Sequence, residues 1–232
     1  MLTNYPTDIL TSRQYMDHTP SEKLKRFFVT STPNRFKKGE TILRPGDQRS
    51  SAFYLKKGFV KDSAISHDGR EFTLFIFKPE DIFSYTWIFN KIHNGHFFKA
   101  MVETVIYEKN RESFLLFLEK NPDVQFMLAQ NITIRLGGLT QRMEQLAFGN
   151  ATQKVASIIS ILGERFGRQT EKGIQIPISL TQQDIAELIG ISRETTSIEI
   201  NRLMVDEIIE RYSGTYIIIR PQKLQKLSKL FS

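Results

Sequence analysis

Apolar residues recur at helical spacing in two short segments near the end of the chain. In the first, Ile185 and Ile189 share one face, and Thr181 and Asp184 occupy the positions of a capping box. Gly190 can end this helix, because glycine accepts the left-handed backbone of a helix C-terminus. The pattern therefore predicts a short helix that ends in a tight turn.

A second helix follows from Arg193 to about residue 206. Ser192 can cap this helix, and its inward-facing positions are Thr196, Ile200 and Leu203. The other face is polar and begins at a helix N-terminus. Two helices joined in this way form a helix-turn-helix, which places its second helix in the DNA major groove. The other interpretation is a packed helical hairpin in some other kind of domain.

The segments around this motif predict a winged helix. Residues 208–212 and 215–220 flank Ser213-Gly214 and form a hairpin, which we interpret as the wing. Upstream, residues 151–166 read as a helix, 167–173 as a polar loop and 174–178 as a short strand. The basic, amphipathic residues 221–232 predict a packing helix rather than a membrane anchor.

Short apolar runs separated by turn residues extend from about Asn34 to Lys109. Asp68-Gly69, between 60–65 and 72–77, is a strong hairpin signal, and residues 97–107 read as one late strand. This spacing predicts a β-sandwich, barrel or jelly roll. Before it, residues 1–20 have no clear period, and 21–28 suggest a short helix capped by serine.

Two helices are predicted after the strands, one capped by Asn110 and one running from Pro122 to about Phe148. The second would be about 40 Å long. Its apolar residues alternate by four and three, which is an a/d seam. We favour a coiled-coil dimer interface over packing on the chain's own strands. The seam contains Ile132, Leu136, Leu139, Met143 and Leu146. Gly149 and Asn150 then form a hinge-like break.

Composition narrows the partners and the chemistry. The net charge is +7, and the basic excess is not concentrated in the C-terminal segment, which supports only a moderate phosphate-binding surface. The chain contains no cysteine, which excludes disulfides and thiolate metal sites. The sequence shows no membrane-spanning run and no signal peptide, so we expect a cytoplasmic protein.

Candidate enzyme chemistry is scarce. His93 and His96 form an H-x-x-H pair, but they surround Asn94-Gly95, and we interpret the segment as a turn rather than a metal site. No nucleophile–base arrangement or glycine-rich phosphate loop is evident. We expect no enzymatic activity, no metal and no cofactor.

The order of these elements resembles the Crp-Fnr family of bacterial transcription regulators over about residues 20–220. The sharpest match is the helix-turn-helix, where the family pattern T-x-x-(D/E)-I-A-x-x-(I/L)-G-x-S-R-E-T is reproduced by Thr181, Asp184, Ile185, Ala186, Gly190, Ser192, Arg193, Glu194 and Thr195. Residues 143–148 resemble the end of the family's dimer helix. Residues 38–40, 44–47, 53–58 and 79–83 resemble its strand and turn signatures.

The resemblance implies an α+β fold in three parts. These are an N-terminal antiparallel β-roll of the cyclic-nucleotide-binding, jelly-roll type, a long dimerisation helix and a C-terminal winged helix-turn-helix. The corresponding segments are an N-terminal arm at 1–20, the effector-binding-like β-roll at 21–120, the dimerisation helix at 121–148 and the DNA-binding domain at 149–232. Double-stranded DNA, a second copy of the chain, an unidentified small-molecule effector and RNA polymerase are the implied partners.

The cyclic-nucleotide cassette of the family is altered in this chain. The position of the glutamate that holds the ribose reads Tyr85, and the position of the arginine that pairs the phosphate reads Phe98 or Lys99. A buried phosphate without a cationic fork is costly, so we predict no tight binding of cyclic AMP. Tyr85, Trp87, Phe98 and Lys99 could instead line a pocket for another effector. We favour core packing for most of the aromatic residues.

The resemblance also assigns DNA contacts. Arg193 and Glu194 should read base edges, Ser197 can serve either base, and Ile198 stands where many members have a guanine-contacting arginine. Thr181, Gln182 and Thr195 are the expected phosphate contacts. We therefore predict a homodimeric, sequence-specific DNA-binding regulator on a pseudo-palindromic site. The alternative is a ligand sensor that acts mainly through protein–protein contacts.

Overall fold

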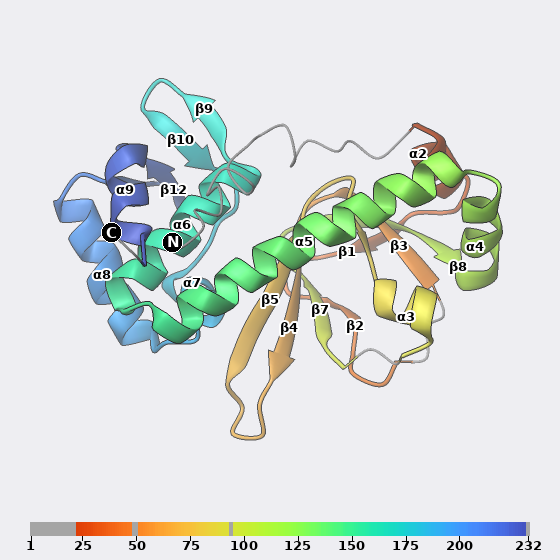
Figure 1. The fold of residues 1–232 in the computed structure, drawn as a ribbon, viewed down its shortest axis with the longest axis horizontal. Helices are drawn as coiled ribbons and strands as arrows, with labels where there is room; N and C mark the ends of the chain where they lie inside the picture. Colours follow the sequence, from red (N-terminus) through yellow and green to blue (C-terminus); the bar gives the residue numbers. More distant parts are fainter. Residues whose placement is uncertain (1–21, 48–50, 93–94, 231–232) are drawn as a thin grey trace, which may run out of the picture. The chain divides into compact units, whose positions relative to one another are not determined.

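The computed structural model describes residues 22–47, 51–92 and 95–230, which form two compact units. One unit reaches Thr133 and the other begins at Ile134. The boundary therefore lies inside helix α5 (Pro122–Phe148), which Figure 1 shows as one uninterrupted helix. The arm predicted at 1–20, together with the serine cap at Ser21, lies outside the described residues.

The first unit is built on two four-stranded antiparallel sheets. One has the order β1 (Asn34–Phe36), β8 (Thr104–Asn110), β3 (Ser51–Lys57), β6 (Ile82–Phe83). The other has the order β2 (Thr41–Leu43), β7 (Phe97–Ala100), β4 (Val60–Ile65), β5 (Glu71–Phe77). The predicted antiparallel β-roll is confirmed.

The interior of the roll is filled by phenylalanine rings. Phe83 stacks on Phe53 with centroids 5.2 Å apart and on Phe98 at 5.3 Å, and Phe77 lies 5.3 Å from Phe83. All four side chains are at most 5% exposed. Burial of such large apolar rings is the main stabilising contribution to this unit.

A second cluster joins the roll to its helices. It contains residues of α2 (Glu22–Val29), α4 (Arg111–Glu119) and the first turns of α5. The N-cap predicted at Asn110 is confirmed, since its side chain accepts a hydrogen bond of 2.8 Å from the Ser113 amide. The long helix predicted from Pro122 to Phe148 is confirmed with the same bounds.

The strands confirm the predicted hairpin but split the predicted late strand. Gly69 closes the β4–β5 turn with a φ of +82°. Residues 97–107, however, form β7 and β8 in two different sheets. The chain bends before Thr104, whose hydroxyl donates to the Val102 carbonyl at 2.8 Å. The prediction of one strand was wrong, because the two halves pair in different sheets; the bend lies close against Gly58, where an added Cβ would lie 2.5 Å from the Thr104 hydroxyl.

The second unit contains the end of α5 and a winged helix. Its elements are α6 (Ala151–Phe166), α7 (Gln182–Ile189), α8 (Arg193–Val205), α9 (Pro221–Ser228) and a sheet of order β11 (Ile209–Tyr212), β12 (Thr215–Ile218), β10 (Gly173–Ile176), β9 (Arg168–Thr170). The predicted hairpin around Ser213-Gly214 and the predicted terminal helix are confirmed.

Two elements differ from the sequence-based prediction. The polar loop expected at 167–173 contains β9, which pairs with β10. Its residues lack apolar alternation, because β9 is an edge strand with polar side chains at the surface. The short helix α3 (Tyr85–Asn90) was not predicted, since Ser84 before it adopts a left-handed conformation with φ of 76° and makes no side-chain cap.

Candidate nucleic-acid interface

The turn between α7 and α8 is built by side-chain caps. The Thr181 hydroxyl accepts from the Asp184 amide at 3.1 Å, and the Thr181 amide donates to the Asp184 carboxylate at 2.8 Å, which is the predicted capping box. Gly190 ends α7 with φ of 64°. Ser192 then caps α8 by accepting from the Thr195 amide at 3.1 Å. Local sequence therefore fixes the angle at which α8 begins.

The inner face of α8 anchors it to the domain. Thr196 and Ile200 are fully buried, and Leu203 is 1% exposed, as predicted. The Thr196 hydroxyl donates to the Ser192 carbonyl at 2.9 Å, so its one polar group is satisfied inside the core. This anchoring leaves the other face of α8 at the surface.

The outer face of α8 carries the expected base-reading residues. Arg193, Glu194 and Ile198 are exposed, and Ser197 is half-buried. Ile198 is 66% exposed, which is unusual for a branched aliphatic side chain on a polar helix face. Farther along α8 the exposed residues are Asn201, Arg202 and Val205.

Glu194 is held in its ionised form. Its own backbone amide, and then the Ser192 hydroxyl, hydrogen-bond the carboxylate and lower its pKa. The first turn of α8 therefore presents a carboxylate, which accepts hydrogen bonds, beside the guanidinium of Arg193, which donates them. This pair of groups offers both hydrogen-bonding types that base edges require.

The three expected phosphate contacts differ in what they can donate. Both polar groups of Thr181 are committed to Asp184, since its hydroxyl also donates to that carboxylate at 2.6 Å. Thr181 is therefore a structural cap, and its expected donation to a phosphate would require breaking the capping box. The Thr195 hydroxyl lies 3.0 Å from the Ser192 hydroxyl and shares a hydrogen bond with it. Gln182 is half-buried in the first turn of α7.

The expected effector pocket is not assembled as predicted. Phe98 is 5% exposed and belongs to the roll's core, where it lies opposite Asp62 in the ladder. Lys99 is the next residue of β7 and points to the other face, because side chains alternate along a strand. The two residues cannot line one pocket. Trp87 is half-buried on α3, and the Tyr85 side chain lies outside the description.

Lys99 already has a partner in the chain. Its ammonium lies 3.3 Å from the Glu71 carboxylate, which Lys61 also contacts at 3.0 Å and to which the Ser63 hydroxyl donates at 2.6 Å. Burial would raise the pKa of Glu71, but the hydrogen bonds from Ser63 and Lys61 and the charge of both lysines outweigh it and lower the pKa. Lys99 is therefore engaged in an ion-pair cluster.

The H-x-x-H segment is only partly described, since His93 lies outside the described residues. His96 contacts the Asp62 carboxylate through Nδ1 at 3.1 Å, and this hydrogen bond raises the histidine pKa. Within the described ranges, no three His, Cys, Asp or Glu side chains converge to hold a metal ion. None of the described helices is long and apolar enough to cross a membrane.

Two residues with a role beside the DNA-binding motif were missed in the sequence. Arg142 donates through Nη2 to the Leu188 carbonyl of α7, and the Gln145 amide donates to the Ser228 carbonyl of α9 at 2.9 Å. Their spacing placed them off the apolar seam of α5. The sequence carries no signal for such partners, because a backbone carbonyl has no residue identity.

Comparison with known proteins identifies the class. The Crp-like helix-turn-helix domain matches residues 153–227, and the cyclic nucleotide-binding domain matches residues 33–121. A β-roll followed by a long helix and a winged helix-turn-helix defines a transcription regulator with a DNA-binding domain. The chain belongs to the Crp-Fnr family of transcription regulators.

Individual relatives agree with this family. A CRP-like cAMP-activated global transcriptional regulator of Mycobacterium tuberculosis is 27% identical over 75% of this chain and 76% of its own. A global nitrogen regulator of Synechococcus elongatus is 25% identical over 83% and 87%. Among solved structures, a CooA mutant from Carboxydothermus hydrogenoformans has a TM-score of 0.77 at 24% identity and covers 92% of this chain and 97% of its own.

Proposed function

We propose that the protein regulates transcription as a homodimer that binds a two-fold symmetric DNA site. The observation that carries this proposal is the capped helix α8, whose buried inner face leaves Arg193, Glu194 and Ile198 exposed together. A helix presented in this way fits the major groove. The regulators named among the relatives support the same function. Cytoplasmic location follows from that function.

The exposed seam of α5 supports the dimer. Leu136 is 62% exposed, Met143 61% and Ile132 38%, and they lie on one face of the helix. A row of exposed large apolar side chains is costly in water and indicates a partner. A second copy is the natural partner, because parallel seams of this period pair with themselves. Leu139 is half-buried, and Leu146 also packs on α6 and α7.

The recognition residues suggest the chemistry of the half-site. The Arg193 guanidinium suits guanine O6 and N7, and the Glu194 carboxylate accepts from cytosine N4. The exposed Ile198 suits a thymine methyl group, so the half-site should carry an A·T pair where an arginine would select guanine. Ser197 can serve either base. Gln182 and Thr195 are the phosphate contacts, together with the backbone amides at the start of α7.

We further propose that the effector is not cyclic AMP. Phe98 fills the core where the family's binders have an arginine, and Lys99 is paired with Glu71. A cyclic phosphate would then lack a cationic fork. RNA polymerase would be the partner if the regulator activates transcription.

Selection of sites from a random duplex pool at about 150 mM salt tests this proposal, since counterion-driven binding is suppressed there. The expected result is a two-fold symmetric consensus with half-sites about one helical turn apart, enriched equally with and without cyclic AMP. Absence of any enriched sequence, in the apo protein and across a ligand screen, would overturn it.

A further inference from the structure

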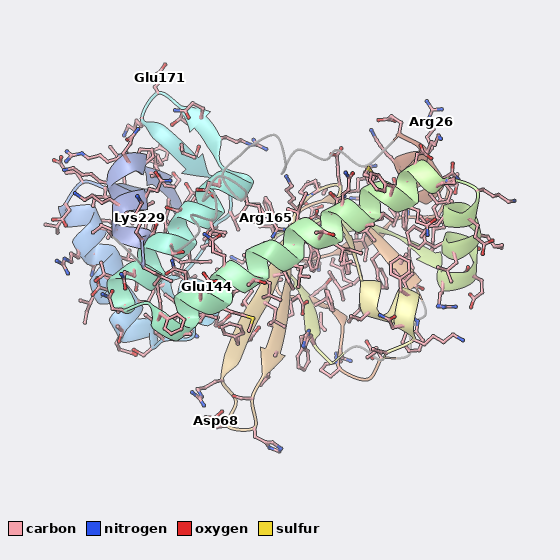
Figure 2. All side chains as sticks on the ribbon, viewed as in Figure 1. Arg26, Asp68, Glu144, Arg165, Glu171 and Lys229 are labelled. Carbon is pink, nitrogen blue, oxygen red and sulfur yellow. The ribbon has the colours of Figure 1, made fainter. Side chains whose placement is uncertain are left out.

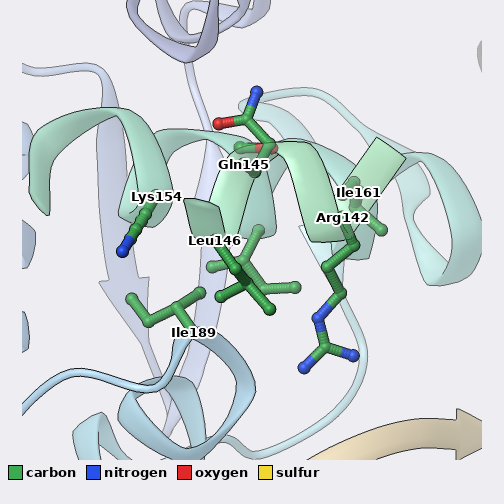
Figure 3. Close-up of a pocket in the computed structure, with 8 residues that line it drawn as sticks. Arg142, Gln145, Leu146, Lys154, Ile161 and Ile189 are labelled. Atoms are coloured by element: carbon green, nitrogen blue, oxygen red, sulfur yellow. The ribbon is translucent and has the colours of Figure 1, made fainter. Parts of the chain in front are cut away.

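The end of α5 packs against the winged helix through three residues of its last two turns. Figure 3 shows that Arg142, Gln145 and Leu146 come from α5, Lys154 and Ile161 from α6, and Ile189 from α7. Leu146 lines the same small pocket as Ile161 and Ile189. Two polar residues of α5 therefore lie beside this apolar contact.

The two polar residues make the same kind of bond. Leu188 and Ser228 lie in the last turns of α7 and α9, where backbone carbonyls have no partner within their own helix. Arg142 donates to the Leu188 carbonyl, and Gln145 donates to the Ser228 carbonyl at 2.9 Å. A cation at a helix C-terminus also interacts favourably with the helix dipole. Side chains of α5 thus cap two helices of the winged domain.

Both caps are buried, which makes them expensive to break. Gln145 is 9% exposed, and burial lowers the pKa of Arg142 to about 10, so the guanidinium stays charged at neutral pH. If α5 moved away from the winged helix, the carbonyls of Leu188 and Ser228 would lose their hydrogen-bond donors. The buried guanidinium of Arg142 would also lose its acceptor.

The break after α5 is a tight corner. A Cβ added at Gly149 would lie 2.6 Å from the Gln145 carbonyl oxygen. Asn150 caps α6 through a reciprocal pair with Gln153, with both bonds at 2.9 Å. This cap fixes the start of α6 immediately after Gly149, so a swing of the winged helix at the corner would break the caps from α5. The hinge expected there is therefore braced on both sides.

We propose that Arg142 and Gln145 are positioning residues that lock the winged helix-turn-helix to the end of α5 as one rigid block. This inference rests on the proposed function, because the block matters for DNA only if α5 forms the dimer. In the dimer, the block sets the distance and angle between the two α8 helices. Arg142 and Gln145 then determine which spacing of half-sites the protein accepts, without contacting DNA.

The first test is spacing selectivity. The wild type, Arg142→Met, Gln145→Ala and the double variant are titrated with duplexes that hold the selected half-sites at the consensus spacing or one base pair closer or farther. We expect the preference for the consensus spacing to fall by about tenfold in Arg142→Met, which loses one charge-assisted hydrogen bond, and to fall further in the double variant, which loses both bonds. Affinity for a single half-site should stay within about threefold, since the loss is confined to positioning. Gln141→Ala is the matched control, because Gln141 lies on α5 beside Arg142 and one turn before Gln145.

A second test needs no DNA. The chain has no cysteine, so Glu144→Cys on α5 and Arg202→Cys on α8 give two exposed sites for spin labels, with Glu144 marked in Figure 2. Labelled chains are diluted with unlabelled protein so that only distances within one chain are measured. We expect a narrow distance distribution in the wild type and a broad one when Arg142→Met or Gln145→Ala is added. Thermal unfolding confirms that each variant is folded.

The outcomes separate the two proposals. If site selection with the wild type enriches no sequence, the proposed function is wrong. The spin-label distances then still test whether α5 and the winged helix form one rigid block. The positioning role is overturned if the wild type accepts only one half-site spacing and the folded variants keep both that spacing preference and the narrow spin-label distance distribution. If the double variant fails to fold, the single Gln145→Ala variant decides the question.

Discussion

The exposed seam of α5 predicts a large effect of one substitution on dimer formation. Leu136 is 62% exposed in a single chain, and full burial of leucine stabilises by about 2.5 kcal/mol, so a dimer would gain about 1.5 kcal/mol from each copy. Leu136→Asn keeps the side-chain size and removes this gain from both copies. The loss of about 3 kcal/mol corresponds to a dimer dissociation constant about 100-fold higher.

Sedimentation over a dilution series measures that constant directly. Leu116→Asn is the matched control, because Leu116 is 55% exposed on α4, outside the seam, and should leave association unchanged. A DNA titration should show the same loss for Leu136→Asn at dilute protein, since two half-sites require two chains. The reasoning is refuted if the wild type is monomeric at high concentration, or if Leu136→Asn and Leu116→Asn have equal effects.

Three further predictions concern DNA, ligand and pH. Arg193→Ala should cost about 1–3 kcal/mol of specific binding and relax one base position, measured by repeating the site selection; an unchanged consensus would contradict its role. Cyclic AMP at about 1 mM should not shift the unfolding temperature, whereas occupancy at 100-fold above Kd would stabilise by about 2.7 kcal/mol. The NMR titration midpoint of His96 should lie above the ordinary histidine pKa and fall in Asp62→Asn, which removes the acceptor and charge that raise the His96 pKa and leaves burial, which lowers it. Because its folded pKa is raised, the pair's contribution to stability is complete below pH 6.5 and is lost as pH rises through the folded value; equal midpoints in both proteins would refute this.

The helix-turn-helix could be predicted almost residue by residue because its signals are local. Thr181, Gly190 and Ser192 each act within three or four residues of their own position, and the structure places all three as caps. The β4–β5 hairpin is predictable for the same reason, since Gly69 closes the turn by itself. Local caps therefore mark where α7 begins and ends and where α8 begins.

The features that sequence reasoning missed depend on distant partners. Strand β9 pairs with β10, and the bend between β7 and β8 lies against Gly58, so both features involve residues far away in the sequence or in another element. Phe98 and Lys99 were considered for one pocket, yet strand alternation sends them to opposite faces once the strand is recognised. The hydrogen bonds from α5 to the ends of α7 and α9 were missed as well, because their acceptors are backbone carbonyls of residues far away in the sequence.

Helix α5 thus has two separate tasks on two faces. The stripe that includes Leu136 and Met143 is exposed and is the proposed dimer surface, while Arg142 and Gln145 bind the winged helix of the same chain. Gly137 and Gly138 lie in α5 between Leu136 and Arg142. Each glycine in a helix interior lowers helix stability by about 1 kcal/mol relative to alanine. A Cβ added at Gly137 would meet no atom of the described residues within 4 Å, so packing does not require glycine there. If the regulator bends on binding an effector, the weakest point of α5 is this glycine pair rather than the braced corner at residues 149–150.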